Sequence, residues 1–195
     1  MENLIQPIIL KAKEKNLSIR KPTAKDRKLI SKIVKKEDYL YGWKESTLNQ
    51  LLIATNDDIL SMMTFKIQPD NIYLNGIETR ERYSNMGLAS YLIDALIMIG
   101  RKLNKKNIQL YVAEGIDNQR AIKFYERRGF KLDEDTIDAQ AEDELIQLTA
   151  DYFDIETFEV EDDQIDEFSS DEDITVDDLK ENIIDTFYPM ILYLK

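Results

Sequence analysis

The stretch Tyr83-Ser84-Asn85-Met86-Gly87-Leu88-Ala89 lies between two segments of different periodicity and decides how the chain folds. Before it, residues 72–77 carry alternating bulky side chains up to Gly76, which predicts a strand. After it, apolar residues recur at helical spacing, which predicts a helix over residues 88–103. This order points the unpaired amides of the first helical turn into the loop. Such amides bind phosphate, and Gly87 would let it come close, although Gly87 could equally serve only a tight turn.

A second stretch carries more information. The apolar run over residues 107–112 is typical of a strand, and it is followed by Asn118-Gln119-Arg120-Ala121-Ile122-Lys123-Phe124-Tyr125-Glu126-Arg127-Arg128-Gly129-Phe130. This sequence resembles the N-x-x-A-x-x-x-Y-x-x-x-G-F signature of the GNAT superfamily of acetyl-CoA-dependent N-acetyltransferases. The Gly87 turn lies where that family has its diphosphate loop, usually R/Q-x-x-G-x-G/A. The resemblance covers residues 17–132 and the last eight residues.

The resemblance implies an α/β fold of the GNAT type, with a mixed, mostly antiparallel central sheet flanked by helices and splayed at the cofactor site. Residues 1–195 would form a single GNAT-like domain with its core at residues 17–132 and 188–195. Residues 133–187 hold 23 acidic residues and one basic residue. We interpret them as an acidic insert before the last strand, with helices over residues 145–153 and from Thr175, and a mobile loop over residues 156–173.

By the same resemblance, acetyl-CoA is the acetyl donor. Backbone groups at the end of the central strand would pair with the pantetheine arm, the loop amides would hold the diphosphate, and Asn118 would bind pantetheine or cap its helix. The expected cofactor-binding residues are Ile77, Thr79, Ser84, Asn85, Met86, Gly87, Leu88, Ala89, Asn118, Ala121 and Tyr125. Ser84 departs from the family pattern, because it replaces an Arg or Gln that braces the loop. Arg80 or Arg82 could compensate.

Tyr125 is the expected catalytic acid by resemblance, because a phenol is a donor at neutral pH and could protonate the departing sulfur. The alternative is a tyrosine packed in the core. Glu78 is the candidate base, acting through water, with Tyr73 and Asn75 as competitors, and no base is needed if the amine loses its proton to bulk water. The chain has no histidine and no cysteine, which excludes a histidine base, disulfides and thiolate metal sites, and we expect no metal.

These residues predict an N-acetyltransferase that moves the acetyl group of acetyl-CoA to a primary amine by direct attack. The acceptor would be a small-molecule or protein amine, and a cationic one if the acidic insert lines its path, although charge runs are usually solvated faces. The alternative is a catalytically weak or inactive GNAT-like binding or regulatory module whose acidic insert engages a basic partner. We expect a cytoplasmic chain without a membrane span or a signal peptide. A net charge of −12 does not favour nucleic acid, and a homodimer is compatible with the family.

The other predicted elements are a helix over residues 1–15 broken at Pro7, strand 17–21, a helix capped by Thr23 with Asp26, a helix over residues 45–53 running into a strand, strand 59–67, and a closing strand 188–195. Turn signals at residues 56–58 and 69–71 favour antiparallel pairing. The aromatic residues Tyr39, Tyr41 and Trp43 could form a wall of the acceptor cleft or could simply pack.

Overall fold

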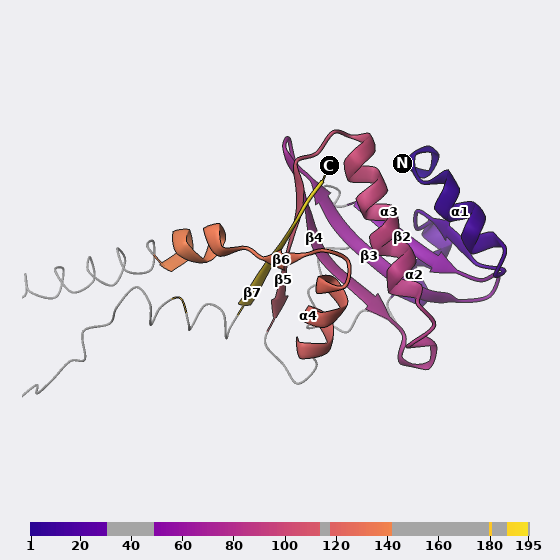
Figure 1. Ribbon diagram of the computed structural model, residues 1–195. Coiled ribbons are helices and arrows are strands. Elements are labelled where there is room, and N and C mark those ends of the chain that lie inside the picture. The colour runs from indigo at the N-terminus through magenta and orange to yellow at the C-terminus, as the bar shows by residue number, and fades with distance from the viewer. Residues whose placement is uncertain (31–48, 114–117, 142–179, 181–186, 195) are drawn as a thin grey trace, which may run out of the picture. The chain divides into compact units, whose positions relative to one another are not determined.

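The computed structural model of the chain (Figure 1) describes residues 1–30, 49–113, 118–141, 180 and 187–194. These residues divide into two compact units. The first unit comprises residues 1–110 and 191–195, and the second comprises residues 111–190. Among the described helices, none has both the length and the apolar character that crossing a membrane requires.

The sheet of the first unit follows the chain order. β1 (Ser18–Arg20), β2 (Asn49–Ala54), β3 (Ile59–Ile67) and β4 (Asn71–Thr79) pair antiparallel with their neighbours, and β5 (Asn107–Ala113) pairs parallel with β4. With β6 (Lys131–Leu132) and β7 (Phe187–Tyr193), the strand order is β1-β2-β3-β4-β5-β7-β6. This mixed, mostly antiparallel sheet confirms the predicted fold class.

The helices of the first unit are η1 (Glu2–Leu4), α1 (Gln6–Lys13), η2 (Ala24–Asp26), α2 (Arg27–Ile30), η4 (Glu81–Tyr83) and α3 (Leu88–Lys102). Figure 1 shows α1 and α3 side by side on the sheet of this unit. The helix predicted over residues 1–15 is interrupted at Ile5, between η1 and α1, so that Pro7 lies in the first turn of α1 and not at the break itself. A proline there costs no hydrogen bond, since its missing N–H would have no helical partner.

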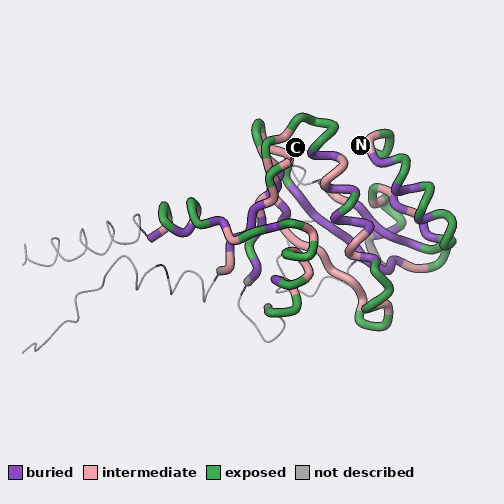
Figure 2. The backbone as a smooth tube through the Cα atoms, in the orientation of Figure 1, coloured by how far each residue is buried: buried purple, intermediate pink, exposed green. Residues whose placement is uncertain are grey.

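One face of this sheet is apolar and packs against α3. A Cβ atom on Gly100 of α3 would lie 2.4 Å from Cδ1 of Leu194 and 3.5 Å from Cδ1 of Ile72, so the helix backbone approaches this face closely. Figure 2 shows the strands beneath the helix as buried. The buried side chains that register places on this face are Leu51, Ile53, Met63, Phe65, Ile72, Leu74, Ile108 and Leu110. Each contributes about 1.5–3 kcal/mol by leaving water.

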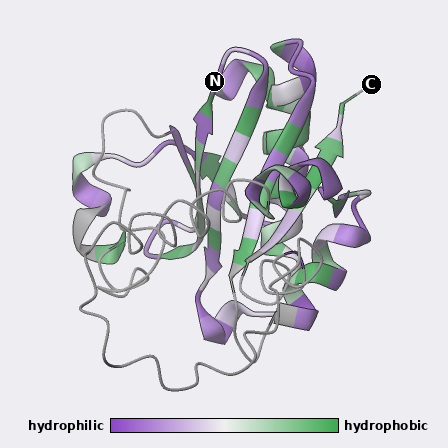
Figure 3. Cartoon of the chain, turned by 90° about the vertical axis from the view of Figure 1, so that its left-hand side faces the viewer, coloured by the Kyte–Doolittle hydropathy of each residue, from purple (hydrophilic) through white to green (hydrophobic). Residues whose placement is uncertain are grey.

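The opposite face changes character along the sheet. Near α2 it is apolar, where Leu52 and Met62 pack with Ile30. Toward β4 and β5 it carries polar side chains, and hydropathy alternates along the strands in Figure 3. The residues that register places on this polar part are Gln50, Thr64, Tyr73, Glu78, Asn107 and Gln109. Glu78 therefore lies on the sheet face away from α3.

The second unit contains α4 (Asn118–Glu126), β6, part of β7 and a helical segment at residues 134–141. Asp133 begins this segment: its carboxylate accepts a hydrogen bond from the hydroxyl of Thr136 (2.8 Å), and its amide donates to the carbonyl of Pro189 (3.1 Å). Lys180 forms an ion pair of 2.7 Å with Asp138. The segment that follows Asp133 is thus helical, and its first residue is hydrogen-bonded to β7.

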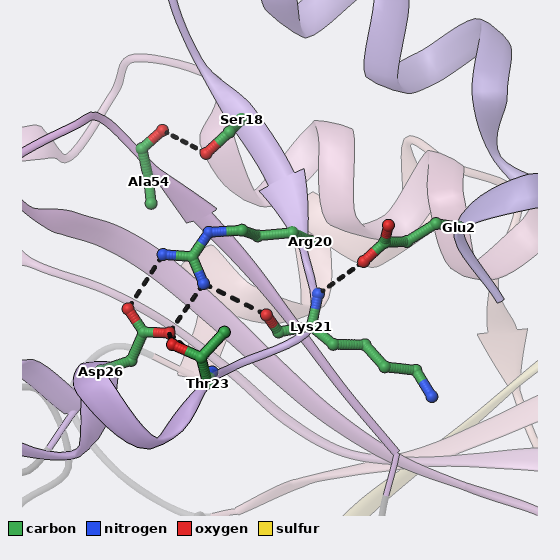
Figure 4. A network of polar contacts seen from close by, with 7 residues as sticks. All are labelled: Glu2, Ser18, Arg20, Lys21, Thr23, Asp26 and Ala54. Carbon is green, nitrogen blue, oxygen red and sulfur yellow. Dashed lines mark hydrogen bonds and ion pairs between the residues drawn. The ribbon is translucent and has the colours of Figure 1, made fainter.

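A buried carboxylate holds the start of the first unit (Figure 4). Asp26 accepts two hydrogen bonds from the guanidinium of Arg20 (2.7 and 2.9 Å) and two from the amide and hydroxyl of Thr23 (2.6 and 2.7 Å). The predicted pairing of Thr23 with Asp26 is confirmed, although the first turn is a 3₁₀ helix. This network links β1 to the turn that starts α2.

Several predictions lie outside the described residues. They concern the aromatic connection with Tyr39, Tyr41 and Trp43, the helices of the insert and the loop over residues 156–173. Residues 45–53 were predicted to be a short helix that runs into a strand: the strand is β2, which begins at Asn49, and the helical part before it lies outside the described residues. Residues 51–53 are buried between β1 and β3, and an apolar run of this length cannot show its period.

Candidate cofactor and catalytic site

The loop from β4 to α3 leads into an exposed turn. Its first part is the short helix η4, which is closed by hydrogen bonds from the amide of Tyr83 to the carbonyl of Arg80 (2.8 Å) and from the amide of Ser84 to the carbonyl of Glu81 (2.9 Å). Residues 84–87 are exposed, whereas Leu88 is buried and anchors the helix. Within the described residues, no backbone or side-chain oxygen accepts from the amides of residues 86–89. These amides can therefore bind an external acceptor.

Gly87 itself has the left-handed conformation, with φ 73° and ψ 16°. A Cβ atom built on it would meet no atom of the described residues within 4 Å, so these residues leave the space in front of the helix open. Asn85 also has positive φ (64°), which Asn tolerates better than most residues. Open space, unpaired amides and the positive end of the α3 dipole fit a diphosphate.

The central strand β4 is interrupted by a bulge. Thr64 of β3 pairs with Gly76 and Phe65 pairs with Leu74, so Asn75 is an extra residue between them. The parallel ladder with β5 ends at the pair of Leu74 with Leu110, yet β4 continues to Thr79. The residues after the bulge thus have a strand edge without a ladder to β5, which suits an extended ligand such as pantetheine.

Three predicted site residues occupy this last part of β4. Ile77 and Thr79 lie on the face toward α3, and the hydroxyl of Thr79 is 2.8 Å from that of Ser61. Glu78 lies on the opposite, polar face and is partly exposed. Its carbonyl accepts a hydrogen bond from the hydroxyl of Ser61 (2.8 Å).

Asp58, in the turn between β2 and β3, binds the loop before α3. Its carboxylate pairs with the guanidinium groups of Arg80 and Arg82 and accepts a hydrogen bond from the hydroxyl of Tyr83 (2.9 Å). Burial would raise the pKa of Asp58, but the bonds from Tyr83 and Arg82 and the charges of the two arginines outweigh it and lower this pKa. The two arginines named as substitutes for the missing Arg or Gln are both bound to this carboxylate.

Tyr125 lies on α4 in the second unit. Its ring packs edge-on against Phe124 and Phe130, with centroids 5.1 and 5.5 Å away. Burial raises the pKa of the Tyr125 phenol to about 12, and the charge of Arg128 opposes this shift only weakly. Its hydroxyl makes no hydrogen bond to any described residue. The side chain is therefore packed, protonated at neutral pH and able to donate to a ligand.

The other predicted residues of the second unit are Asn118 and Ala121. Ala121 precedes Tyr125 by four residues, so the two lie on one face of α4. Asn118 begins the helix, and its side chain lies outside the described part of the chain. The loop residues 84–89 and the strand residues Ile77 and Thr79 belong to the first unit. Each unit thus holds one continuous group of the predicted residues.

Two features of the site were missed from the sequence. Asp58 was interpreted only as part of a turn, because its contacts with residues 80–83 are tertiary. Asn75 was weighed as a base and not as a bulge, and its buried side-chain oxygen has no hydrogen-bond partner among the described residues. The interruption of the strand pattern at Gly76 was the available signal, since glycine inside a strand often accompanies a bulge.

The sequence model of the acetyltransferase (GNAT) family matches residues 19–130, which is more than half of the chain. The chain belongs to the GNAT acetyltransferase family. It is therefore a GNAT-type acetyltransferase, and acetyl-CoA is its acetyl donor. The matched range contains both the Gly87 loop and the helix that carries Tyr125.

Solved GNAT structures share this fold. The ribosomal-protein-S18-alanine N-acetyltransferase from Escherichia coli has a TM-score of 0.52 at 20% identity, covering 60% of this chain and 78% of that one. The PaiA N-acetyltransferase from Thermoplasma acidophilum, in complex with coenzyme A, has a TM-score of 0.50 at 18% identity, covering 60% and 91%. The spermidine/spermine N-acetyltransferase from Vibrio cholerae has a TM-score of 0.50 at 16% identity, covering 62% and 81%. At these identities the likeness is one of fold. No curated protein sequence matches this GNAT chain.

Proposed function

We propose that this chain is an N-acetyltransferase that moves the acetyl group of acetyl-CoA to a primary amine by direct attack. The observation that carries the proposal is the turn at Gly87, where unpaired amides at the start of α3 face open space. Family membership supports the same donor. Bound acetyl-CoA supplies an activated thioester, whose C–S bond breaks as the acetyl carbon bonds to the amine nitrogen.

The cofactor would be held by two groups of residues. The loop residues Ser84, Asn85, Met86, Gly87, Leu88 and Ala89 are proposed to bind the diphosphate, through the amides of residues 86–89 in particular, and the backbone of Ile77 and Thr79 is proposed to bind the pantetheine arm. Asn118, Ala121 and Tyr125 on α4 are the other proposed cofactor-binding residues. The open edge of β4 after Asn75 and the absence of any side chain at Gly87 support this arrangement.

Tyr125 is the proposed acid. Its hydroxyl would give its proton to the sulfur that leaves the acetyl group, so that CoA departs as the thiol and not as the thiolate. A pKa of about 12 keeps this proton in place at neutral pH. The ring contacts with Phe124 and Phe130 would hold the phenol in one orientation, which is what a proton donor requires.

Glu78 is the proposed base. The amine must lose one proton as it bonds to the acetyl carbon, and the carboxylate of Glu78 could accept that proton through a water molecule. Its position on the polar face of the sheet, away from α3, supports this role. Tyr73 and Asn75 on the same strand remain competitors, and direct loss of the proton to bulk water is the third route.

A cationic amine is the proposed acceptor class. The named acceptors of two structural neighbours, spermidine or spermine and an alanine of a ribosomal protein, are amines. The acidic residues of the insert at residues 133–187 would attract such a cation. A polyamine, an aminoglycoside and a lysine side chain all satisfy this chemistry. We further propose that residues 1–195 form one GNAT-like domain. We also propose that the protein is cytoplasmic and forms a homodimer.

The alternative function is a catalytically weak or inactive binding module whose insert engages a basic partner. The serine at position 84, where the family has Arg or Gln, favours it. Thiol release from acetyl-CoA in the presence of single amines distinguishes the two. The proposal expects release that depends on a cationic amine, and it fails if the chain binds acetyl-CoA yet releases no thiol with polyamines, aminoglycosides or lysine peptides.

A further inference from the structure

The turn between β2 and β3 holds Asp58 in a fixed place. The backbone carbonyl of Asp58 accepts a hydrogen bond from the amide of Thr55 (2.9 Å), which closes the turn. Its carboxylate also accepts one from the amide of Ile59 (3.0 Å). The Asp58 side chain is only 14% exposed. A carboxylate fixed at both its backbone and its side chain can act as an anchor for another segment.

The segment it anchors is the loop that leads to Gly87. Arg80, Arg82 and Tyr83 all bind the Asp58 carboxylate, and the guanidinium of Arg82 also lies 4.7 Å from the Tyr83 ring centroid. The amide of Arg80 donates to the carbonyl of Leu60 (3.0 Å), next to the same turn. Three successive contacts thus join the loop to the rigid β2–β3 hairpin, immediately before the exposed residues 84–87.

These contacts could take the place of the Arg or Gln side chain that the family has at the position of Ser84. Residues 84–87 are exposed, and two of them have positive φ, so the turn has little packing of its own. Ser84 cannot supply the brace that an Arg or Gln would supply. Amides bind an anion tightly only if they are already aimed at it, because aiming them on binding costs conformational entropy.

We propose that Asp58 is a positioning residue for the diphosphate of acetyl-CoA, acting through Arg80, Arg82 and Tyr83 on the amides that follow them. Asp58 itself would not touch the cofactor. The inference rests on the proposed binding of acetyl-CoA at Gly87 and adds the reason why a chain with Ser84 can still bind it.

Charge and position act in opposite directions at Asp58. Removing its negative charge would leave two arginines unneutralised near a diphosphate, which by electrostatics alone would strengthen binding. Losing the anchor would weaken it. Asp57 separates the two effects, because it is the neighbouring residue, is exposed, and makes no hydrogen bond or ion pair within the described chain. Asp57→Asn therefore removes the same charge from the same turn without removing the anchor.

The test is the dissociation constant of coenzyme A, measured by calorimetry on the full chain, for wild type, Asp58→Asn, Asp58→Glu and Asp57→Asn. We expect Asp58→Asn to weaken binding about tenfold, since it replaces charge-assisted hydrogen bonds by weaker ones. Asp58→Glu should recover part of the loss, and Asp57→Asn should stay within about twofold of wild type. In turnover, the KM for acetyl-CoA should rise with Asp58→Asn while kcat at saturating cofactor stays nearly constant.

Unchanged or tighter binding by Asp58→Asn, or an equal loss in Asp57→Asn, would overturn the role of Asp58. If Asp58→Asn does not fold, Tyr83→Phe removes one of the donors and should weaken binding about threefold, being a single hydrogen bond; unaltered affinity would again overturn it. A wild-type chain that binds no coenzyme A refutes the proposed function itself, whereas a wild type that binds with an unaffected Asp58→Asn refutes this inference alone.

Discussion

Tyr125 is partly buried and is not a core residue. Its ring is packed between Phe124 and Phe130, yet its hydroxyl makes no hydrogen bond to the described residues. The free donor is what a leaving sulfur would use.

Replacing Tyr125 by Phe should therefore reduce kcat by about 10²-fold, the usual contribution of a general acid. The ring contacts remain, so the KM for acetyl-CoA and the melting temperature should change little. Steady-state thiol release at saturating amine measures both constants. A kcat within twofold of wild type would remove Tyr125 from the mechanism.

The pH profile provides a second test of the same residue. Since burial raises the pKa of Tyr125 to about 12, its protonated form persists throughout the neutral and mildly alkaline range. We expect kcat to show no alkaline decrease below about pH 10, because an ordinary phenol would begin to lose its proton there and this one would not. A decrease with a midpoint near pH 9 in wild type that Tyr125→Phe abolishes would contradict the assignment.

The role of a residue could be predicted from the sequence where the residue belongs to a motif. It could not be predicted where the role depends on a tertiary contact. Gly87 and Tyr125 could be assigned from spacing and resemblance. The Asp58 contacts could not, because they join a hairpin turn to a loop that is distant in sequence. Nothing in the local pattern around Asp58 distinguishes it from Asp57, which is exposed and makes no comparable contact.

At the scale of elements, the turn into α3 depends on a left-handed residue. Gly87→Val would force a β-branched side chain to φ 73°, at a cost of about 1–2 kcal/mol or more, and would also fill the open space in front of the amides. We expect a melting temperature lower by several degrees and no measurable binding of coenzyme A, by thermal melting and calorimetry.

Gly87→Asn is the matched control, because Asn tolerates left-handed backbone. It should melt close to wild type and still bind coenzyme A poorly, since its side chain would occupy the proposed diphosphate position. Normal binding by both variants would mean that the anion does not lie at this turn.

The network that starts the first unit predicts an acid-dependent stability. The hydrogen bond from Arg20 lowers the pKa of Asp26 far below its usual value. Burial would raise this pKa, but the hydrogen bonds from Thr23 also lower it. A carboxyl with a lowered folded pKa stabilises the fold above its unfolded pKa of about 3.9 and loses that contribution as the pH falls through the acid range. Asp26→Asn should cost roughly 1–3 kcal/mol at pH 7, with a smaller difference from wild type near pH 3.

Urea unfolding of both proteins at the two pH values measures this difference. A gap that stays constant between pH 7 and pH 3 would show that Asp26 contributes through packing and not through its charge. The network lies on β1 and η2, and the proposed site lies on β4 and α3, so the variant should still bind coenzyme A.

Elements with a clear period were predicted closely. The bounds of β4 and α3 were expected within one or two residues, because bulky side chains alternate up to Gly76 and the helical spacing from Leu88 is unbroken. The residue at which β2 begins could not be predicted, since a strand buried on both faces shows no alternation. The bulge at Asn75 could not be predicted from β4 alone, because a bulge is defined by the register between two paired strands.

For the whole molecule, the family followed from two short motifs in the right order, and the sequence model of the GNAT acetyltransferases confirms it over residues 19–130. Overall composition would have been misleading, because the net charge of −12 arises in residues 133–187 while the rest of the chain is basic. A basic GNAT core suits an anionic cofactor, and an acidic insert suits a cationic acceptor. The basic part of the chain would thus attract acetyl-CoA, and the acidic residues 133–187 would attract the proposed cationic amine.

The most direct test of the central claim is a titration of the full chain with acetyl-CoA, followed by calorimetry and by thermal melting. The account predicts saturable binding of one acetyl-CoA per chain, with a melting temperature that rises with ligand concentration in wild type and does not rise in Gly87→Val. No heat of binding and no change in melting temperature for the wild-type chain at millimolar acetyl-CoA would contradict it.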